Sequence, residues 1–261
     1  MNQAAGDGTD RYHRSMTPTG GEGRVALVTG ASRGIGAGIA RHLLDRGVRV
    51  AGAYRSGRDS VVELAARHPG QVLPVHLDLA DPDTLSAGVD EVHRHWGRLD
   101  SLVLNAAVWD GGRLTRMDPD AWWRVVETNL RGTATIVRAA VPHLIAGENP
   151  SIVIVGSVVG EIGFPGDTAY ASAKAAAVGF ARSLAKELAS KKVRVNVLAP
   201  GFVDTDMTAA VPAGSRNAIV EATLLGRFGT VDEISRAAVF LAEDATFCTG
   251  TVLTADGGWS L

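Results

Sequence analysis

Val25-Ala-Leu-Val-Thr-Gly-Ala-Ser-Arg-Gly-Ile-Gly36 is a short segment that sets the architecture of the whole chain. Its first residues form an apolar, β-rich run, which is typical of a buried strand. Three glycines follow, and apolar residues then recur at helical spacing from Ile39 to Leu44, before a stop at Gly47. A glycine-rich turn therefore joins a strand to a helix N-terminus, where unpaired N–H groups and the helix dipole favour phosphate. The context favours a dinucleotide site over a merely structural turn.

The rest of the chain alternates between strand and helix patterns. Further strands are expected at 49–54, 72–76, 101–104, 151–155, 193–198 and 251–254, several of them as continuous apolar runs. Helices are expected at 60–67, 84–95, 119–144, 169–189 and 231–242. This order predicts a single-domain α/β Rossmann fold over residues 23–261, with a doubly wound, seven-stranded parallel sheet flanked by helices. Residues 1–22 are polar and lack the apolar core of a signal peptide, so we expect a flexible N-terminal extension.

A second motif carries acid–base chemistry. Tyr170 and Lys174 are four residues apart, and Ser157 precedes them. Residues i and i+4 share one face of a helix, so the ammonium group is expected near the phenol. A nearby cation favours the phenolate and lowers the pKa of a tyrosine. A phenol tuned in this way exchanges a proton with an alcohol or carbonyl oxygen. Taken alone, the pair also fits a small-residue helix with one buried tyrosine and one extended lysine.

Together, the two motifs resemble the classical short-chain dehydrogenase/reductase family over residues 24–261. Asn129, Ser157, Tyr170 and Lys174 match its catalytic tetrad in order and spacing. Within the family, the chain looks most like 3-oxoacyl-[acyl-carrier-protein] reductases, on stretches such as Glu127-Thr-Asn-Leu130 and Gly226-Arg-Phe-Gly229. The resemblance implies that Tyr170 is the general acid, that Ser157 orients the substrate oxygen, and that Lys174 tunes Tyr170 and holds the nicotinamide ribose. It implies that Asn129 holds a water linking Lys174 to solvent.

The resemblance also defines a cofactor site. Asn105-Ala-Ala107 resembles the segment after the fourth strand, and Pro200-Gly-Phe-Val-Asp-Thr205 resembles the loop that touches the nicotinamide. Asp78 resembles the residue that contacts adenine, although it could also be a helix N-cap. The expected cofactor contacts are Gly30, Ser32, Arg33, Gly34, Ile35, Gly36, Arg55, Asp78, Leu79, Asn105, Ala106, Tyr170, Lys174, Pro200, Gly201, Val203 and Thr205.

Charge argues for NADP(H) as the cofactor. A site that prefers NAD usually carries an acidic residue about twenty positions beyond the glycines. The second predicted strand instead ends in Ala53-Tyr-Arg-Ser56, with no carboxylate. Arg55 and Arg33 suit a 2′-phosphate, because guanidinium binds phosphate well. The alternative is that both arginines are solvated at the surface.

The substrate is less well defined by the sequence. An apolar pocket is expected from Val108, Trp109 and the segments 159–164 and 207–225, which suits an acyl chain or a polyketide-like ring. Its main lining residues are expected to be Trp109, Val159, Phe164 and Met207. The segment 104–107 lacks the first Asn and the final Gly of the family pattern, and 146–150 lacks the basic residues that meet an acidic carrier protein. The predicted reaction is NADPH-dependent reduction of a 3-oxoacyl thioester or polyketide-type ketone. The alternatives are a dehydrogenase of a free steroid, sugar or cyclic alcohol, and a non-catalytic nucleotide-binding regulator.

Composition and charge limit the classes of partner that this chain is expected to bind. The chain has 261 residues and a formal net charge of -2, which gives no sign of a nucleic-acid partner. It has one cysteine and no apolar stretch long enough to span a bilayer, so we expect a cytoplasmic protein with no membrane partner. No metal is expected, because the histidines are scattered along the chain. An acyl carrier protein remains a candidate partner.

Assembly can also be predicted. The helix expected at 169–189 is rich in Ala and Gly, which allows another helix to approach closely. The chain ends in apolar and aromatic residues, Trp259 and Leu261 among them. In the resembling family both regions form two-fold contacts, and two such contacts generate a homotetramer. The alternative is that both segments pack within one subunit.

Overall fold

The computed structural model describes residues 23–209 and 211–261. A seven-stranded parallel sheet forms its centre, in the order β3-β2-β1-β4-β5-β6-β7. The strands are β1 (Val25–Val28), β2 (Arg49–Tyr54), β3 (Val72–His76), β4 (Ser101–Leu104), β5 (Ser151–Val155), β6 (Arg194–Pro200) and β7 (Val252–Ala255). The predicted fold class is confirmed. The expected extension at 1–22 lies outside the described residues.

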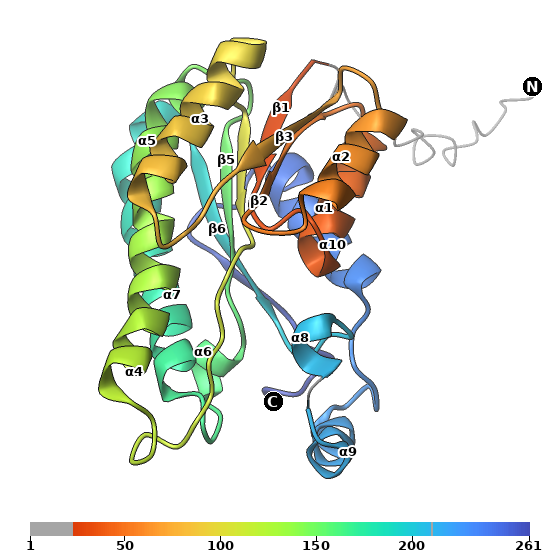
Figure 1. Ribbon diagram of the computed structural model, residues 1–261, viewed down its shortest axis with the longest axis vertical. Coiled ribbons are helices and arrows are strands. Elements are labelled where there is room, and N and C mark those ends of the chain that lie inside the picture. Colours follow the sequence, from red (N-terminus) through yellow and green to blue (C-terminus); the bar gives the residue numbers. More distant parts are fainter. Residues whose placement is uncertain (1–22, 210) are drawn as a thin grey trace, which may run out of the picture.

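Helices cover both faces of this sheet (Figure 1). The helical elements are α1 (Gly34–Leu44), α2 (Arg58–Arg67), α3 (Pro82–Trp96), α4 (Pro119–Val126), η1 (Glu127–Arg131), α5 (Gly132–Ile145), α6 (Val159–Ile162), α7 (Thr168–Leu188), η2 (Ala189–Lys191), α8 (Asp206–Ala209), α9 (Ala213–Ala222), α10 (Val231–Val239) and η3 (Phe240–Asp244). One core lies between the sheet and α3, α5 and α7, and a second lies between the sheet and α1, α2 and α10. Both faces are therefore apolar, which explains the continuous hydrophobic strands.

The structure modifies several predicted elements. The helix expected at 119–144 is interrupted by η1, a π-helical turn, and the last helix ends in a second π turn, η3. The strand expected at 193–198 begins at Arg194 and runs on to Pro200. The sequence did not predict α6, α8 or α9. These three short helices all lie beyond the carboxyl ends of β5 and β6, near the lower end of the molecule in Figure 1.

The strand order reverses between β1 and β4. The chain leaves β1 toward β2 on one side, whereas β4 pairs with β1 on the other. Ligands bind open α/β sheets in the crevice beyond the carboxyl ends of the strands, at such a switch point. This geometry places the glycine-rich turn after β1 beside the segment that follows β4.

Candidate functional site

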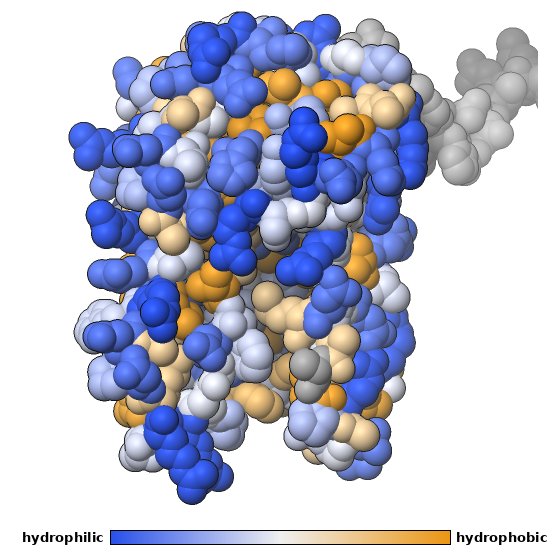
Figure 2. All heavy atoms as spheres, viewed as in Figure 1, coloured by the Kyte–Doolittle hydropathy of each residue, from blue (hydrophilic) through white to orange (hydrophobic). Residues whose placement is uncertain are grey.

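A cleft of about 600 Å³ opens at this edge of the sheet. Figure 2 shows the molecule hollowed in its lower half, between the part that carries α4 and α6 and the part that carries α8 and α9. Most of the predicted site residues line the cleft: Gly30, Ser32, Arg33, Gly34, Ile35, Arg55, Asp78, Leu79, Asn105, Ala106, Trp109, Ser157, Tyr170, Lys174, Pro200, Gly201, Val203, Thr205 and Met207. The structure thus brings together residues from nearly the full length of the chain.

Close packing shapes the glycine-rich turn. Gly30 has a φ of 67°, in the left-handed region that favours glycine. A Cβ atom at Gly36 would lie 2.2 Å from the carbonyl oxygen of Gly30, so no side chain fits there. Gly36 therefore does not line the cleft but lets α1 start directly against the turn. The N-cap residue of α1, Arg33, provides no side-chain cap for the first N–H groups. This uncapped helix end facing a cleft fits the phosphates of a dinucleotide.

Thr29 links the turn to the segment after β4. Its hydroxyl accepts hydrogen bonds from the backbone N–H groups of Asn105 and Ala106, both at 2.9 Å. The side-chain amide nitrogen of Asn105 donates to the carbonyl oxygen of Thr29 at 3.0 Å. These bonds hold the two loops on either side of the switch point in one fixed arrangement.

Two arginines and one aspartate mark the outer end of the cleft. Arg33 is exposed and lies 3.7 Å from a carboxylate oxygen of Asp206, and Arg55 follows β2. Asp78 accepts a hydrogen bond from the N–H of Ala80, whereas the N-cap of α3 is Asp81. The N-cap alternative for Asp78 is therefore wrong. Two guanidinium groups thus lie at this end of the cleft, and the one of Arg33 faces the carboxylate of Asp206.

Tyr170 and Lys174 lie on the first turns of α7, and both line the cleft with Ser157. The ammonium nitrogen of Lys174 lies 5.4 Å from the centre of the Tyr170 ring. It donates a hydrogen bond to the carbonyl oxygen of Val155 at 2.7 Å. Ser157 follows β5, and its hydroxyl accepts from the N–H of Val159 at 3.2 Å. The shared helix face predicted from the i, i+4 spacing is present.

Burial is the main cause of the pKa shifts of Tyr170 and Lys174. It lowers the pKa of Lys174 to about 8. Burial, together with the nearby carboxylate of Asp167, raises the pKa of Tyr170 above its ordinary value of 10. The expectation that Lys174 lowers the pKa of Tyr170 below its ordinary value is therefore wrong. The physical reason is that the phenolate would lose hydration and face a negative charge, while the ammonium group is bonded to Val155.

Asn129 lies in η1, and its side chain forms hydrogen bonds with backbone groups. Its amide nitrogen donates to the carbonyl oxygens of Val108 and Val125, at 2.8 and 2.9 Å. Its amide oxygen accepts from the N–H of Val108 at 2.9 Å. Both amide hydrogens are thus occupied, and the side chain fixes the segment after β4. The expected water-holding role of Asn129 stays a prediction.

Comparison with known proteins agrees with this geometry. A family model described as "Enoyl-(Acyl carrier protein) reductase" matches residues 30–260. Proteins called 3-oxoacyl-[acyl-carrier-protein] reductase FabG are similar over 91% of this chain. The one from Thermotoga maritima is 39% identical over 98% of its own length, and the one from Escherichia coli is 39% identical over 97%. The chain belongs to the short-chain dehydrogenase/reductase family. It is accordingly an oxidoreductase of a family that uses a nicotinamide cofactor.

Two of the predicted substrate-pocket residues of this short-chain dehydrogenase/reductase lie elsewhere. Val159 is buried at the start of α6. Phe164 belongs to an aromatic cluster, with its ring centre 5.7 Å from that of Phe202 and 6.0 Å from that of Trp259. Neither lines the cleft, because packing against their own neighbours occupies both side chains. Trp109 and Met207 do line it.

Sequence reasoning missed some lining residues. These are Thr29, Ser56, Leu77, Thr128, Val155, Gly156 and Asp206, with Ala107 also present from the quoted family segment. Most of them are immediate neighbours of predicted residues, so their positions follow from the same loops. Thr208 lies in the segment 207–225 that was expected to form the pocket. It belongs to α8, and its hydroxyl accepts from the N–H of Thr205 at 3.1 Å.

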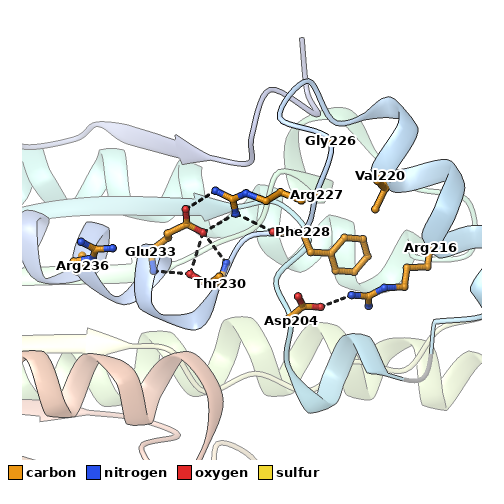
Figure 3. A pocket seen from close by; sticks show the side chains of 9 residues that line it. All are labelled: Asp204, Arg216, Val220, Gly226, Arg227, Phe228, Thr230, Glu233 and Arg236. Carbon is orange, nitrogen blue, oxygen red and sulfur yellow. Dashed lines mark hydrogen bonds and ion pairs between the residues drawn. The ribbon is translucent and has the colours of Figure 1, made fainter.

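A second hollow of about 510 Å³ lies outside the cleft (Figure 3). Ion pairs fill much of its lining. Arg227 and Glu233 form a double hydrogen bond, which lowers the pKa of Glu233 to about 2. Arg216 of α9 bonds Asp204 at 2.5 Å and lies 4.0 Å above the Phe228 ring. The contacts of Arg216 thus join α9 to the loop after β6. The same loop contributes Val203 and Thr205 to the cleft.

The described residues contain no cluster of three or more His, Cys, Asp or Glu side chains that could hold a metal ion. None of their helices combines the length and the hydropathy needed to cross a bilayer.

Proposed function

We propose that this chain is an NADPH-dependent ketoreductase that reduces a 3-oxoacyl thioester, or a polyketide-type ketone, to a secondary alcohol. One observation carries the proposal. Ser157, Tyr170 and Lys174 meet in the same cleft as the glycine-rich turn. The high identity to the reductases named above supports the 3-oxoacyl thioester as substrate.

The residues divide the work in the following way. When bound, the nicotinamide supplies the hydride that reduces the carbonyl carbon. Ser157 donates a hydrogen bond to the substrate oxygen and orients it. Tyr170 gives its proton to that oxygen as negative charge develops. The phenol of Tyr170 is protonated at neutral pH and therefore holds the proton that it transfers. Lys174, with its pKa of about 8, can restore that proton near neutral pH.

Replacing Tyr170 with Phe tests the catalytic assignment. The ring fills the same space without the phenol, so we expect a loss of about 10²–10⁴-fold in kcat. NADPH binding, followed by its fluorescence, should survive in the variant. Retention of more than half of the wild-type kcat would refute the role of Tyr170 as proton donor.

The preference for NADPH rests on Arg33 and Arg55, which we propose flank the 2′-phosphate. Arg55→Asp removes a phosphate partner and adds an acceptor for a ribose hydroxyl. We expect this variant to narrow or reverse the ratio of kcat/KM for NADPH and NADH. Arg58→Asp, at the start of α2, is the matched control for charge alone. Equal use of the two cofactors by the unmodified enzyme contradicts the proposal.

An acyl carrier protein is the proposed macromolecular partner. Lys191 and Lys192 are exposed after α7 and can meet an acidic surface. Glu148 is exposed as well and pairs with Arg98 at 3.4 Å, so the turn before β5 adds negative charge instead. This observation favours a second candidate function, reduction of a free small ketone. Comparing turnover of a carrier-bound 3-oxoacyl thioester with that of a free ketone distinguishes the two.

We further propose a homotetramer. Large apolar side chains are exposed on the last part of the chain: Leu224, Leu225, Phe240, Phe247 and Leu261. Leu225 donates its N–H to the carbonyl oxygen of Gly257, so Leu224 and Leu225 lie beside the C-terminal segment. The Ala-rich α7 and the adjacent α5 supply a second surface. Light scattering at micromolar concentration should return four subunits, and a monomer mass would reject the assembly.

A further inference from the structure

Three hydrogen bonds join the loop after β4 and the helix α4 to residues at the start of α7. The indole N–H of Trp109 donates to a carboxylate oxygen of Asp167 at 2.9 Å. The N–H of Gly112 donates to the carbonyl oxygen of Gly166 at 2.8 Å. The indole N–H of Trp122, on α4, donates to the hydroxyl of Thr168 at 3.0 Å. Parts of the chain that lie 46 to 58 residues apart in sequence are therefore joined beside Tyr170.

Asp167 occupies the N-cap position of α7 but does not act as a cap. Aspartate is favoured at N-caps because its carboxylate accepts an N–H of the first turn. Here the side chain accepts no such bond from α7. Losing a cap typically costs about 1 kcal/mol of stability. The carboxylate is instead committed to the indole of Trp109, even though burial raises the pKa of this group.

Trp109 presents its ring system to the cleft. It lines the cleft together with Ser157 and Tyr170, and 48% of its surface remains exposed. The indole packs closely on Gly111, where a Cβ atom would lie 2.5 Å from the indole Cζ2 atom. A bond to Asp167 on one edge and close packing on Gly111 hold the indole in one orientation. The result is a flat, rigid wall on the substrate side of the cleft.

We propose that Trp109, held by Asp167, determines substrate shape, because its fixed indole admits the straight chain of a linear 3-oxoacyl thioester and excludes ring-shaped ketones. This inference rests on the function proposed above and makes it more specific. A straight acyl chain is slim enough to lie along the flat indole and gains apolar contact there. A bicyclic ketone is wider than a straight chain, and the indole lines the same cleft as Tyr170.

The test measures kcat/KM with NADPH for two substrates, an acetoacetyl thioester and the bicyclic ketone 1-decalone. In Trp109→Ala, the ratio of linear to bicyclic activity should fall at least tenfold. Asp167→Ala should lower the ratio in the same direction, because the indole loses its anchor. Asp167→Asn should keep the wild-type ratio, since its amide oxygen still accepts the indole N–H.

Trp122→Phe is the matched control. It removes a neighbouring indole and its bond to Thr168, but Trp122 does not line the cleft. A purely structural role for these tryptophans would give both variants the same small change in the ratio. Thermal denaturation and NADPH binding show whether each variant is folded.

The outcomes separate this inference from the proposed function. Turnover of both substrates with an unchanged ratio in Trp109→Ala overturns the role of Trp109 alone. A wild-type protein that reduces neither substrate overturns the proposed function, and the inference with it. A higher ratio in Trp109→Ala also contradicts the inference, since it means that the indole favours the bicyclic ketone.

Discussion

Lys174→Met should separate stability from function at this site. Lys174 is 7% exposed, and burial lowers the pKa of its ammonium group to about 8 from an ordinary 10.5. The folded chain therefore binds this proton less tightly than the unfolded chain does. The resulting destabilisation is fully present below about pH 8 and disappears as the pH rises toward 10.5. Since one pH unit corresponds to about 1.36 kcal/mol, the full effect is ~3 kcal/mol.

Methionine keeps the unbranched side chain but removes the charge. It also leaves the carbonyl oxygen of Val155 without the 2.7 Å bond from Lys174, which costs about 1–3 kcal/mol for a buried group. Removing the charge relieves ~3 kcal/mol of destabilisation, and losing the hydrogen bond costs about 1–3 kcal/mol. We therefore expect the variant to be as stable as the wild type at pH 7, or up to ~2 kcal/mol more stable. The same variant should have almost no reductase activity, because nothing restores the proton of Tyr170.

The measurement is urea denaturation at pH 7 and pH 10, followed by tryptophan fluorescence at one fixed subunit concentration. The free energy of unfolding of the wild type, relative to that of the variant, should rise by ~2–3 kcal/mol between the two pH values. Lys186→Met serves as the control, because Lys186 is exposed on the same helix and its replacement should produce no such change. A difference between wild type and Lys174→Met that stays constant with pH would refute the argument.

Two further predictions concern the turn after β1 and the helix α9. Gly36→Ala would place a Cβ atom 2.2 Å from the carbonyl oxygen of Gly30, so we expect the Kd for NADPH to rise at least about tenfold by fluorescence titration. Gly214→Ala, which has no heavy atom within 4 Å of the added Cβ, should leave that Kd unchanged. Arg216→Met removes the ion pair that joins α9 to Asp204, and exposed pairs contribute up to about 1 kcal/mol. We expect an increase in substrate KM of about fivefold or less with little change in Tm, and identical steady-state kinetics would contradict this role of Arg216.

The strands could be predicted from sequence because each carries its own signal. β5, for example, is buried along its full length and is read directly as an apolar run at 151–155. The glycine-rich turn was equally clear, since a strand, three glycines and a helix follow one another without a gap. Confirmation of the fold class follows from such local patterns.

The unpredicted parts depend on contacts that no local pattern encodes. α8 has only four residues, and Thr208 bonds back to the loop after β6 to hold it in place. The helix at 119–144 looked continuous because the π turn carries the helical backbone from α4 into α5 without a break. The pKa of Tyr170 was predicted in the wrong direction, because the i, i+4 spacing with Lys174 is visible in the sequence while the extent of burial is not.

The π turn η1 also limits how this chain can evolve. Such a turn holds one residue more than an α-helical turn, and it sits between the buried residue Val125 of α4 and the buried face of α5. Deleting one residue there would either rotate α5 by about 100°, turning Ile136 and Leu144 away from the sheet, or release the amide of Asn129 from Val108. Point substitutions on the outer surface of this helix can accumulate freely, whereas the loss of a single codon within it would disrupt the core and the cleft at the same time.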